Sequence, residues 1–208
     1  INGRVPVTLH WPAADDQVSP ICSYQVEARL ANLSWSPVGS ATLATRRVTL
    51  TRPGFATSYR VRAVACSGAE SRWLAGSTIV PHVIQENAPA IKKQGPWRRV
   101  PDRQHSGGAQ LVALGAGAAV SFNAANVTDI AYLATTGPAG GWPHVRIDLA
   151  AATLVSLHSE IVHHRRLAYV HHLAEAGTAS LTIHSGSAPN SRTTLDAIII
   201  LRTLPTQP

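Results

Sequence analysis

One glycine-rich segment combines an aromatic ring with polar neighbours that could bind a ligand. In TGPAGGWPHVR, Trp142 is followed at alternate positions by His144 and Arg146. An indole ring can stack on the flat face of a sugar, and imidazole and guanidinium groups can donate hydrogen bonds to its hydroxyls. The three residues therefore predict a ligand-binding surface. The alternative is that Trp142 packs over the end of its domain.

The ten histidines suggest a metal site, because eight of them follow residue 100. Neighbouring residues of a strand point to opposite faces, however, so the pairs His163-His164 and His171-His172 each divide between two faces. A zinc site would need partners from different strands, such as His163 with His172. We therefore predict no metal, and we interpret the histidines as surface groups that change charge near pH 6.

Motifs for catalysis are not recognisable in the chain. The segment GAGAAV (115–120) lacks the third glycine of a dinucleotide loop and leads into the strand-like VSF. Six acidic residues follow residue 86, with Asp148 and Asp196 inside strand patterns, so the two carboxylates of a glycosidase cannot be assigned. A G-x-S-x-G nucleophile motif does not occur. We predict that the protein is not an enzyme and that it has no cofactor.

The composition is that of a globular protein. The 208 residues are 45% hydrophobic and 14% charged, which suits two domains of about 100 residues each. The net charge of +7 is spread evenly: residues 1–86 hold eight basic and five acidic residues, and residues 87–208 hold ten and six. No apolar run approaches the ~20 residues of a membrane helix. We therefore predict no nucleic-acid partner and no membrane insertion.

Short strand-like segments separated by turns run through the whole chain. Fifteen glycines and 14 prolines lie among short runs of Val, Ile, Leu and Thr. Period-two alternation is clearest in TSYRVRA, where Tyr59 and Val61 share one face and Arg60 and Arg62 share the other. The segment IVHHRRLAYVHHLAEAG could be a helix by propensity, but its β-branched and aromatic residues favour a strand. The sequence predicts an all-β protein.

The first half resembles a fibronectin type III domain. The resemblance rests on VTLHW, CSYQVEARL and LTRPGFATSYRVRAVACSGAESRW, which occur in the order of that domain's strands. It implies an immunoglobulin-like two-sheet sandwich over residues 1–86, with Trp11 in the core. Trp35 and Trp73 are expected to pack across its outer sheet.

This resemblance also implies a disulfide between Cys22 and Cys66, the two cysteines of the chain. In a fibronectin type III domain the strands that hold them are antiparallel neighbours. The bond would close a loop of about 44 residues and stabilise the fold by about 3 to 4 kcal/mol. Cys22 shares strand parity with Tyr24, whereas Cys66 has the parity opposite to Tyr59, so a bulge or a strand end must let the sulfurs meet. Two buried free thiols are the alternative.

The second half resembles a jelly-roll module similar to carbohydrate-binding modules at the ends of secreted bacterial proteins. The resemblance rests on GPWRRV, SGGAQLVALGAGAAVSF, GGWPHVRIDL, AEAGTASLTIHSG and TTLDAIIILR, in that order. Marks of the module are Trp97, the Gly107-Gly108 pair and Asp196. It implies a jelly-roll β-sandwich over residues 97–204, after a linker at 87–96. Trp97 and Tyr132 are expected in its core.

Together these features predict a non-catalytic extracellular or cell-surface attachment protein. The jelly roll would bind a glycan or another surface polymer, and the first domain would act as a spacer. The alternative is a structural subunit or decoration protein of a surface layer, an extracellular filament or a virion. In that case β faces and an incomplete first strand before Val5 would mediate assembly with other subunits.

Overall fold

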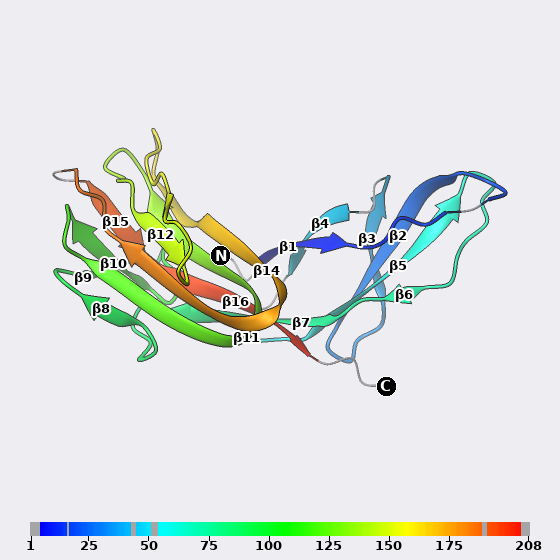
Figure 1. Cartoon of the computed structure of the whole chain (residues 1–208), viewed down its shortest axis with the longest axis horizontal. Helices are drawn as coiled ribbons and strands as arrows, with labels where there is room; N and C mark the ends of the chain where they lie inside the picture. Colours follow the sequence, from blue (N-terminus) through cyan, green and yellow to red (C-terminus); the bar gives the residue numbers. More distant parts are fainter. Residues whose placement is uncertain (1–4, 16, 43–44, 51–53, 189–190, 205–208) are drawn as a thin grey trace. The chain divides into compact units, whose positions relative to one another are not determined.

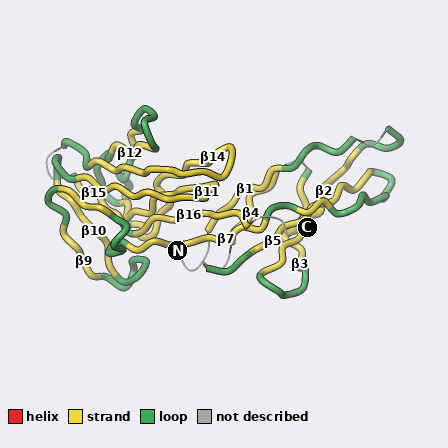
Figure 2. Tube along the Cα trace, turned by 60° about the horizontal axis from the view of Figure 1, so that its bottom comes forward, coloured by secondary structure: helices red, strands yellow, loops and turns green. Residues whose placement is uncertain are grey.

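The fold consists of strands, turns and loops. The computed structural model describes residues 5–15, 17–42, 45–50, 54–188 and 191–204. None of these residues forms a helix, as the yellow strands and green loops of Figure 2 show. A helix of the length and hydropathy that a membrane crossing requires is accordingly not found in the described ranges. The all-β prediction is confirmed.

The chain divides into two compact units, whose main parts are residues 2–81 and 82–202 (Figure 1). We call them the N-terminal unit and the C-terminal unit. The division falls inside strand β7 (Thr78–Gln85), before the predicted domain boundary at 86.

The stretch 87–96, predicted to be a linker, belongs to the C-terminal unit. Ile91 is buried in its core, and β8 (Lys92–Gln94) pairs with β11 (Ala119–Thr136). The polar composition of this stretch therefore gave a wrong prediction. One apolar side chain anchors the stretch in the core, and its backbone groups can form hydrogen bonds with a neighbouring strand whatever the side chains are.

Two sheets build the N-terminal unit. One pairs β1 with β4, and the other has the order β3-β2-β5, with β6 and part of β7 also paired to β5. The bounds are β1 Val5–His10, β2 Ile21–Leu30, β3 Ser36–Ala41, β4 Thr45–Leu50, β5 Thr57–Ala65 and β6 Leu74–Ala75. Leu9 and Trp11 pack on a buried cluster that includes Tyr24 and Val26, so the sheets form a sandwich. The more specific resemblance to fibronectin type III stays a prediction, and residues 1–4, where a first strand would begin, lie outside the described residues.

The predicted alternation in β5 and the predicted disulfide are both confirmed. Every second residue from Thr57 to Ala65 is buried. Cys22 and Cys66 are bonded, with their Cα atoms 4.9 Å apart. The register between β2 and β5 shifts between Ile21 and Ser23, and Cys66 directly follows the end of β5. A bulge at one cysteine and a strand end at the other therefore bring residues of opposite parity together.

The strands of the C-terminal unit form two layers. The smaller has the order β15-β10-β9, and the larger includes β13-β12-β14-β11-β16, with β8 on β11. The bounds not yet given are β9 Arg98–Pro101, β10 Ala109–Leu114, β12 His144–Ile147, β13 Thr153–Leu154, β14 His163–His184, β15 Arg192–Leu195 and β16 Ala197–Leu204. Neighbouring strands in both sheets are antiparallel. This is the sandwich arrangement predicted for the second half.

Two strands of the C-terminal unit are much longer than the short segments expected from the sequence. The strand-like segments AVSFNA and DIAYLAT both lie in β11, and RLAYVHHL and ASLTIH both lie in β14. The pairing of β11 with β14 shifts register around Ala124 to Asp129, where Asn126 has a φ of 55°. Since this stretch holds neither glycine nor proline, the chain absorbs the irregularity as a bulge and does not turn. The strand prediction for IVHHRRLAYVHHLAEAG is confirmed.

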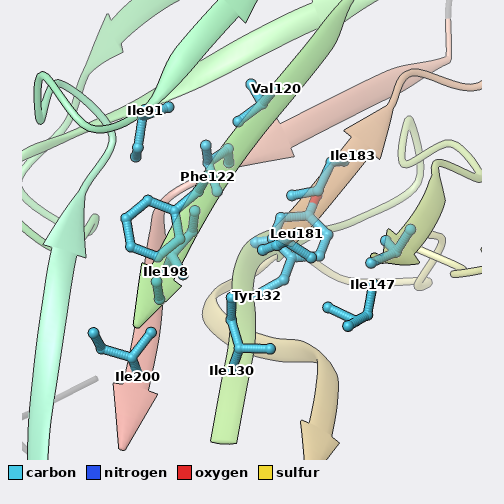
Figure 3. Packing of buried hydrophobic residues seen from close by; sticks show 14 of the residues in the cluster. Ile91, Val120, Phe122, Ile130, Tyr132, Ile147, Leu181, Ile183, Ile198 and Ile200 are labelled. Carbon is cyan, nitrogen blue, oxygen red and sulfur yellow. The ribbon is translucent and has the colours of Figure 1, made fainter. Parts of the chain in front are cut away.

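A large apolar core joins the two sheets of the C-terminal unit. Figure 3 shows the rings of Phe122 and Tyr132 among aliphatic side chains from several strands, including Ile147, Leu181 and Ile198. Each fully buried side chain of this size contributes about 1.5 to 3 kcal/mol. Tyr132 is in the core as predicted, and Trp97 packs against its edge. This core fixes which side chains of β9, β10 and β15 face outward.

Candidate binding cleft

A cleft of about 690 Å³ lies on the outer face of the three-stranded sheet. Leu111 and Leu195 point into the core, so their neighbours Gln110 and Thr194 point the other way, into the cleft. The sheet contributes Arg98, Val100, Gln110, Val112, Leu114, Arg192 and Thr194 to the lining. The floor is therefore a mixed surface of small apolar, amide, hydroxyl and guanidinium groups.

The walls of the cleft are the end of β11, the loop 137–140 and the start of β14. The Thr194 hydroxyl donates to the carbonyl of Thr135 and accepts from its N–H, each at 3.0 Å. A Cβ at Gly140 would lie only 1.9 Å from the carbonyl oxygen of Leu157, so this position requires glycine. The Arg192 N–H donates to the carbonyl of Ala139 at 2.8 Å. The loop is thereby held against β15, and the wall is fixed.

A buried histidine lies between the cleft and a buried carboxylate. The His105 side chain is 2% exposed, and its Nδ1 is 3.4 Å from the Thr135 hydroxyl and 3.9 Å from Asp196 Oδ2. The ring of His164 lies edge-on to it, with centroids 4.9 Å apart. The other Asp196 oxygen accepts the Ser106 N–H at 2.7 Å.

Burial shifts the pKa of both groups of this pair. It raises the pKa of the Asp196 carboxyl to about 6, although the Ser106 N–H opposes the shift. It lowers the pKa of His105, and the neighbouring His164 lowers it further. In both groups burial disfavours the charged form, as expected where charge is removed from water.

Several buried polar atoms of the cleft lining, or directly behind it, have no hydrogen-bond partner. Among the described residues, buried atoms of this kind include Gln110 Oε1, His164 Nδ1 and Asp196 Oδ2. Buried polar atoms are normally paired, so such a group of atoms indicates a site completed by a ligand or by water. Arg98 and Arg192 form no ion pair with any described residue, and Asp102 is the one carboxylate of the lining. The cleft is therefore positively charged.

The three residues predicted to bind a ligand lie outside this lining: His144 and Arg146 are on β12 of the larger sheet, and Trp142 is in the loop before it. Val145 and Ile147 of β12 point into the core, and His144 and Arg146 are exposed on the opposite face. The Trp142 ring is 43% exposed and stacks on His158, with centroids 6.1 Å apart and planes 16° apart. Trp142, His144 and Arg146 stay a predicted surface.

The two histidines named above as possible zinc ligands from different strands are on the same strand. A different pair of histidines comes into contact. His163 and His172 lie on one strand, β14, opposite Thr136 and Asp129 respectively. His105 and His164 meet instead. The first follows the PDRQ turn and the second begins β14, so no local spacing connects them.

No protein-family model and no curated protein matches the chain. Similar solved structures include a family 35 carbohydrate-binding module from Clostridium thermocellum, at 16% identity and a TM-score of 0.41, over 57% of this chain and 97% of that one. A family two carbohydrate esterase from Cellvibrio japonicus gives 20% identity and a TM-score of 0.45, over 62% of this chain and 36% of that one.

An exo-beta-1,3-galactanase from Phanerochaete chrysosporium is similar over 96% of this chain and 54% of its own, at 15% identity and a TM-score of 0.44. The chain thus spans about a third of the esterase and about half of the galactanase. Structural similarity at TM-scores below 0.5 gives no information on function. The function proposed below therefore rests on the geometry of the cleft.

Proposed function

We propose that the C-terminal unit is a non-catalytic module that binds a glycan or another surface polymer in this cleft. The observation that carries the proposal is the lining itself: unpaired guanidinium, amide and imidazole groups surround a space of about 690 Å³. Ligand sites commonly have about 300 to 1,000 Å³ and a few convergent polar groups.

The charge of the cleft favours one kind of polymer. Arg98 and Arg192 present two guanidinium groups to the cleft. A planar guanidinium can donate two parallel hydrogen bonds to one carboxylate. Asp102 is the one acid of the lining. We therefore propose an acidic polysaccharide, such as one that contains uronic acids, in preference to a neutral one.

A non-catalytic role is proposed because glycoside hydrolysis requires two carboxylates across the scissile bond. Asp102 alone is available in the lining. The N-terminal unit is proposed as a spacer. The disulfide between Cys22 and Cys66 is of the kind that persists in oxidising surroundings, which supports a protein that acts outside the cell.

The test is affinity electrophoresis of the whole chain in gels that contain either a uronic acid polymer or a neutral glucan. We expect the acidic polymer to retard the wild type and the Arg166→Ala control, which removes one exposed charge outside the cleft. The double variant Arg98→Ala/Arg192→Ala should bind at least about tenfold more weakly.

Two results would contradict this proposal. Loss of binding in Trp142→Ala with full binding in the double arginine variant would move the site to the exposed face of β12. Failure to bind any polymer, together with concentration-dependent self-association in analytical ultracentrifugation, would favour the assembly role.

A further inference from the structure

We propose that Asp102, His105 and His164 form a site for a divalent transition metal, with Zn²⁺ as the preferred ion. One ligand atom from each of the three residues lies within 4.8 Å of the others, and all three residues line the cleft. The site goes beyond polymer binding, and its existence does not depend on that function.

The donor set selects the metal. Two imidazole nitrogens and one carboxylate oxygen suit Zn²⁺, whereas Ca²⁺ and Mg²⁺ require mostly oxygen ligands. With bonds of about 2.0 to 2.1 Å, ligand atoms of a tetrahedral zinc site lie about 3.3 Å apart. The present separations of up to 4.8 Å therefore close by small side-chain rotations.

A second, independent feature points to the same site. The Asp196 side chain is fully buried, and its Oδ2 has no hydrogen-bond partner and lies 3.9 Å from His105 Nδ1. A metal-bound histidine usually donates its other ring N–H to a carboxylate or carbonyl, which fixes the ring. Asp196 lies on the Nδ1 side of His105, where the Thr135 hydroxyl is the nearer neighbour at 3.4 Å. If Nδ1 donates to either of these groups, Nε2 is the nitrogen left for the ion. The Nδ1 of His164 is also buried without a partner.

The positive charge of Arg165 next to the ligands would repel a metal ion. Its hydrogen bonds show that it also has a structural role at the site. Its guanidinium donates to the carbonyl oxygens of Arg103 and His105, at 3.0 and 2.9 Å. These bonds tie the loop that carries Asp102 and His105 to the strand that carries His164, so they fix the spacing of the ligands. The Asp102 carboxylate, which is itself one of the three ligands, offsets the single positive charge of Arg165.

Three protein ligands leave one position of a tetrahedral zinc ion open. Because the ligands line the cleft, that position faces a space in which water or an oxygen atom of a bound molecule can complete the coordination. The metal would thus add a Lewis-acidic centre to a cleft that otherwise offers hydrogen-bond donors.

The experiment is a titration of the chelator-treated full chain with ZnCl₂ by isothermal calorimetry, repeated with CoCl₂ to record the visible bands of the bound ion. We expect one ion per chain for the wild type and at least about tenfold weaker binding for His164→Ala. His184→Ala is the matched control, because it removes an exposed histidine of the same strand, outside the cleft. His164 and Asp102 are preferred to the buried His105 as targets, and Asp102→Asn provides a second test that conserves shape.

Circular dichroism of each variant checks that it is folded. Saturable binding that is weakened by His164→Ala and Asp102→Asn but not by His184→Ala supports the site. Absence of saturable binding by the folded wild type overturns it, and so does equal affinity of wild type and His164→Ala. Affinity electrophoresis with and without EDTA separates the two proposals, because polymer binding that persists in EDTA leaves the proposed function intact even if no ion binds.

Discussion

The exposed face of the N-terminal unit and the cleft of the C-terminal unit differ in how their polar side chains are paired. On the exposed face of the N-terminal unit, arginines and tryptophans alternate in one stack. Trp35 lies between Arg29 and Arg60, with guanidinium-to-ring distances of 4.8 and 4.5 Å, and Trp73 lies between Arg60 and Arg62, at 4.3 and 4.6 Å. This is the predicted packing of Trp35 and Trp73 across the outer sheet.

The arginines of this stack also form ion pairs and hydrogen bonds with neighbouring side chains. Arg60 pairs with Glu27, and Arg62 pairs with Glu70, both at 2.5 Å. Gln25 accepts two further hydrogen bonds from Arg62, at 2.9 and 2.7 Å. The donors and acceptors of this face are therefore directed at one another.

The cleft of the C-terminal unit is the contrasting case, because Gln110 and His164 of its lining, and Asp196 behind His105, each have a buried atom without a hydrogen-bond partner. An unsatisfied buried polar atom costs about 1 to 3 kcal/mol. Polar groups left unpaired in a cleft lower the stability of the domain but are available to bind a ligand. Polar groups that pair with one another on a surface stabilise the domain and are less available for binding. The comparison supports the assignment of spacer to the first unit and of binding to the second.

The largest expected effect comes from the disulfide. The double variant Cys22→Ala/Cys66→Ala should destabilise the N-terminal unit by about 3 to 4 kcal/mol, because the unfolded chain regains the freedom of a 44-residue loop. Differential scanning calorimetry should show one transition at a lower temperature and a second one unchanged. An equal shift of both transitions would show that the units do not unfold separately, and would break the comparison.

The second effect concerns Arg60, whose guanidinium contacts two rings and one carboxylate. Arg60→Ala should destabilise the N-terminal unit by about 2 kcal/mol, because two cation–π contacts and a partly buried ion pair are lost together. Arg29→Ala, which removes a contact with one ring, is the matched control and should cost less than about 1 kcal/mol. Urea unfolding followed by tryptophan fluorescence measures both, and equal effects would mean that the stack does not act as a unit.

Sequence patterns predicted the features that depend on local alternation. The parity of β5 followed from residues 57–65, and the parity mismatch of Cys22 and Cys66 correctly required a bulge or a strand end. Patterns failed where a decision depended on distant contacts. Residues 87–96 look like a linker until Ile91 is seen to enter a core formed by strands far along the chain.

The cleft lay beyond sequence reasoning for the same reason. Its wall depends on the bond between Thr135 and Thr194, 59 residues apart, and its histidine pair joins His105 to His164. Neither pair has a spacing that marks it. Trp142 was predicted to bind a ligand because a tryptophan in a glycine-rich segment can be recognised in the sequence. The described residues that line the cleft include no Trp, Tyr or Phe, so the sequence gives no comparable signal for it.

The smallest effect provides the sharpest test, because it predicts opposite signs for one chemical change. Gln110 in the cleft is 8% exposed and has an unpaired Oε1, whereas Gln25 accepts two bonds from Arg62. Replacing an unsatisfied amide by an apolar group of similar shape removes a desolvation cost, so Gln110→Leu should stabilise the C-terminal unit by about 1 kcal/mol. Gln25→Leu should destabilise the N-terminal unit by about 1 kcal/mol, since it leaves part of a guanidinium without its acceptor.

Calorimetry of the two leucine variants measures each shift in the transition of its own unit, and affinity electrophoresis reports the second consequence. Gln110→Leu should bind the acidic polymer more weakly while it is more stable, whereas Gln25→Leu should bind as the wild type does. A destabilised Gln110→Leu would mean that the amide is already satisfied by ordered water in the free protein. In that case the cleft would not differ from the outer face of the first unit in the way that assigns it the binding role.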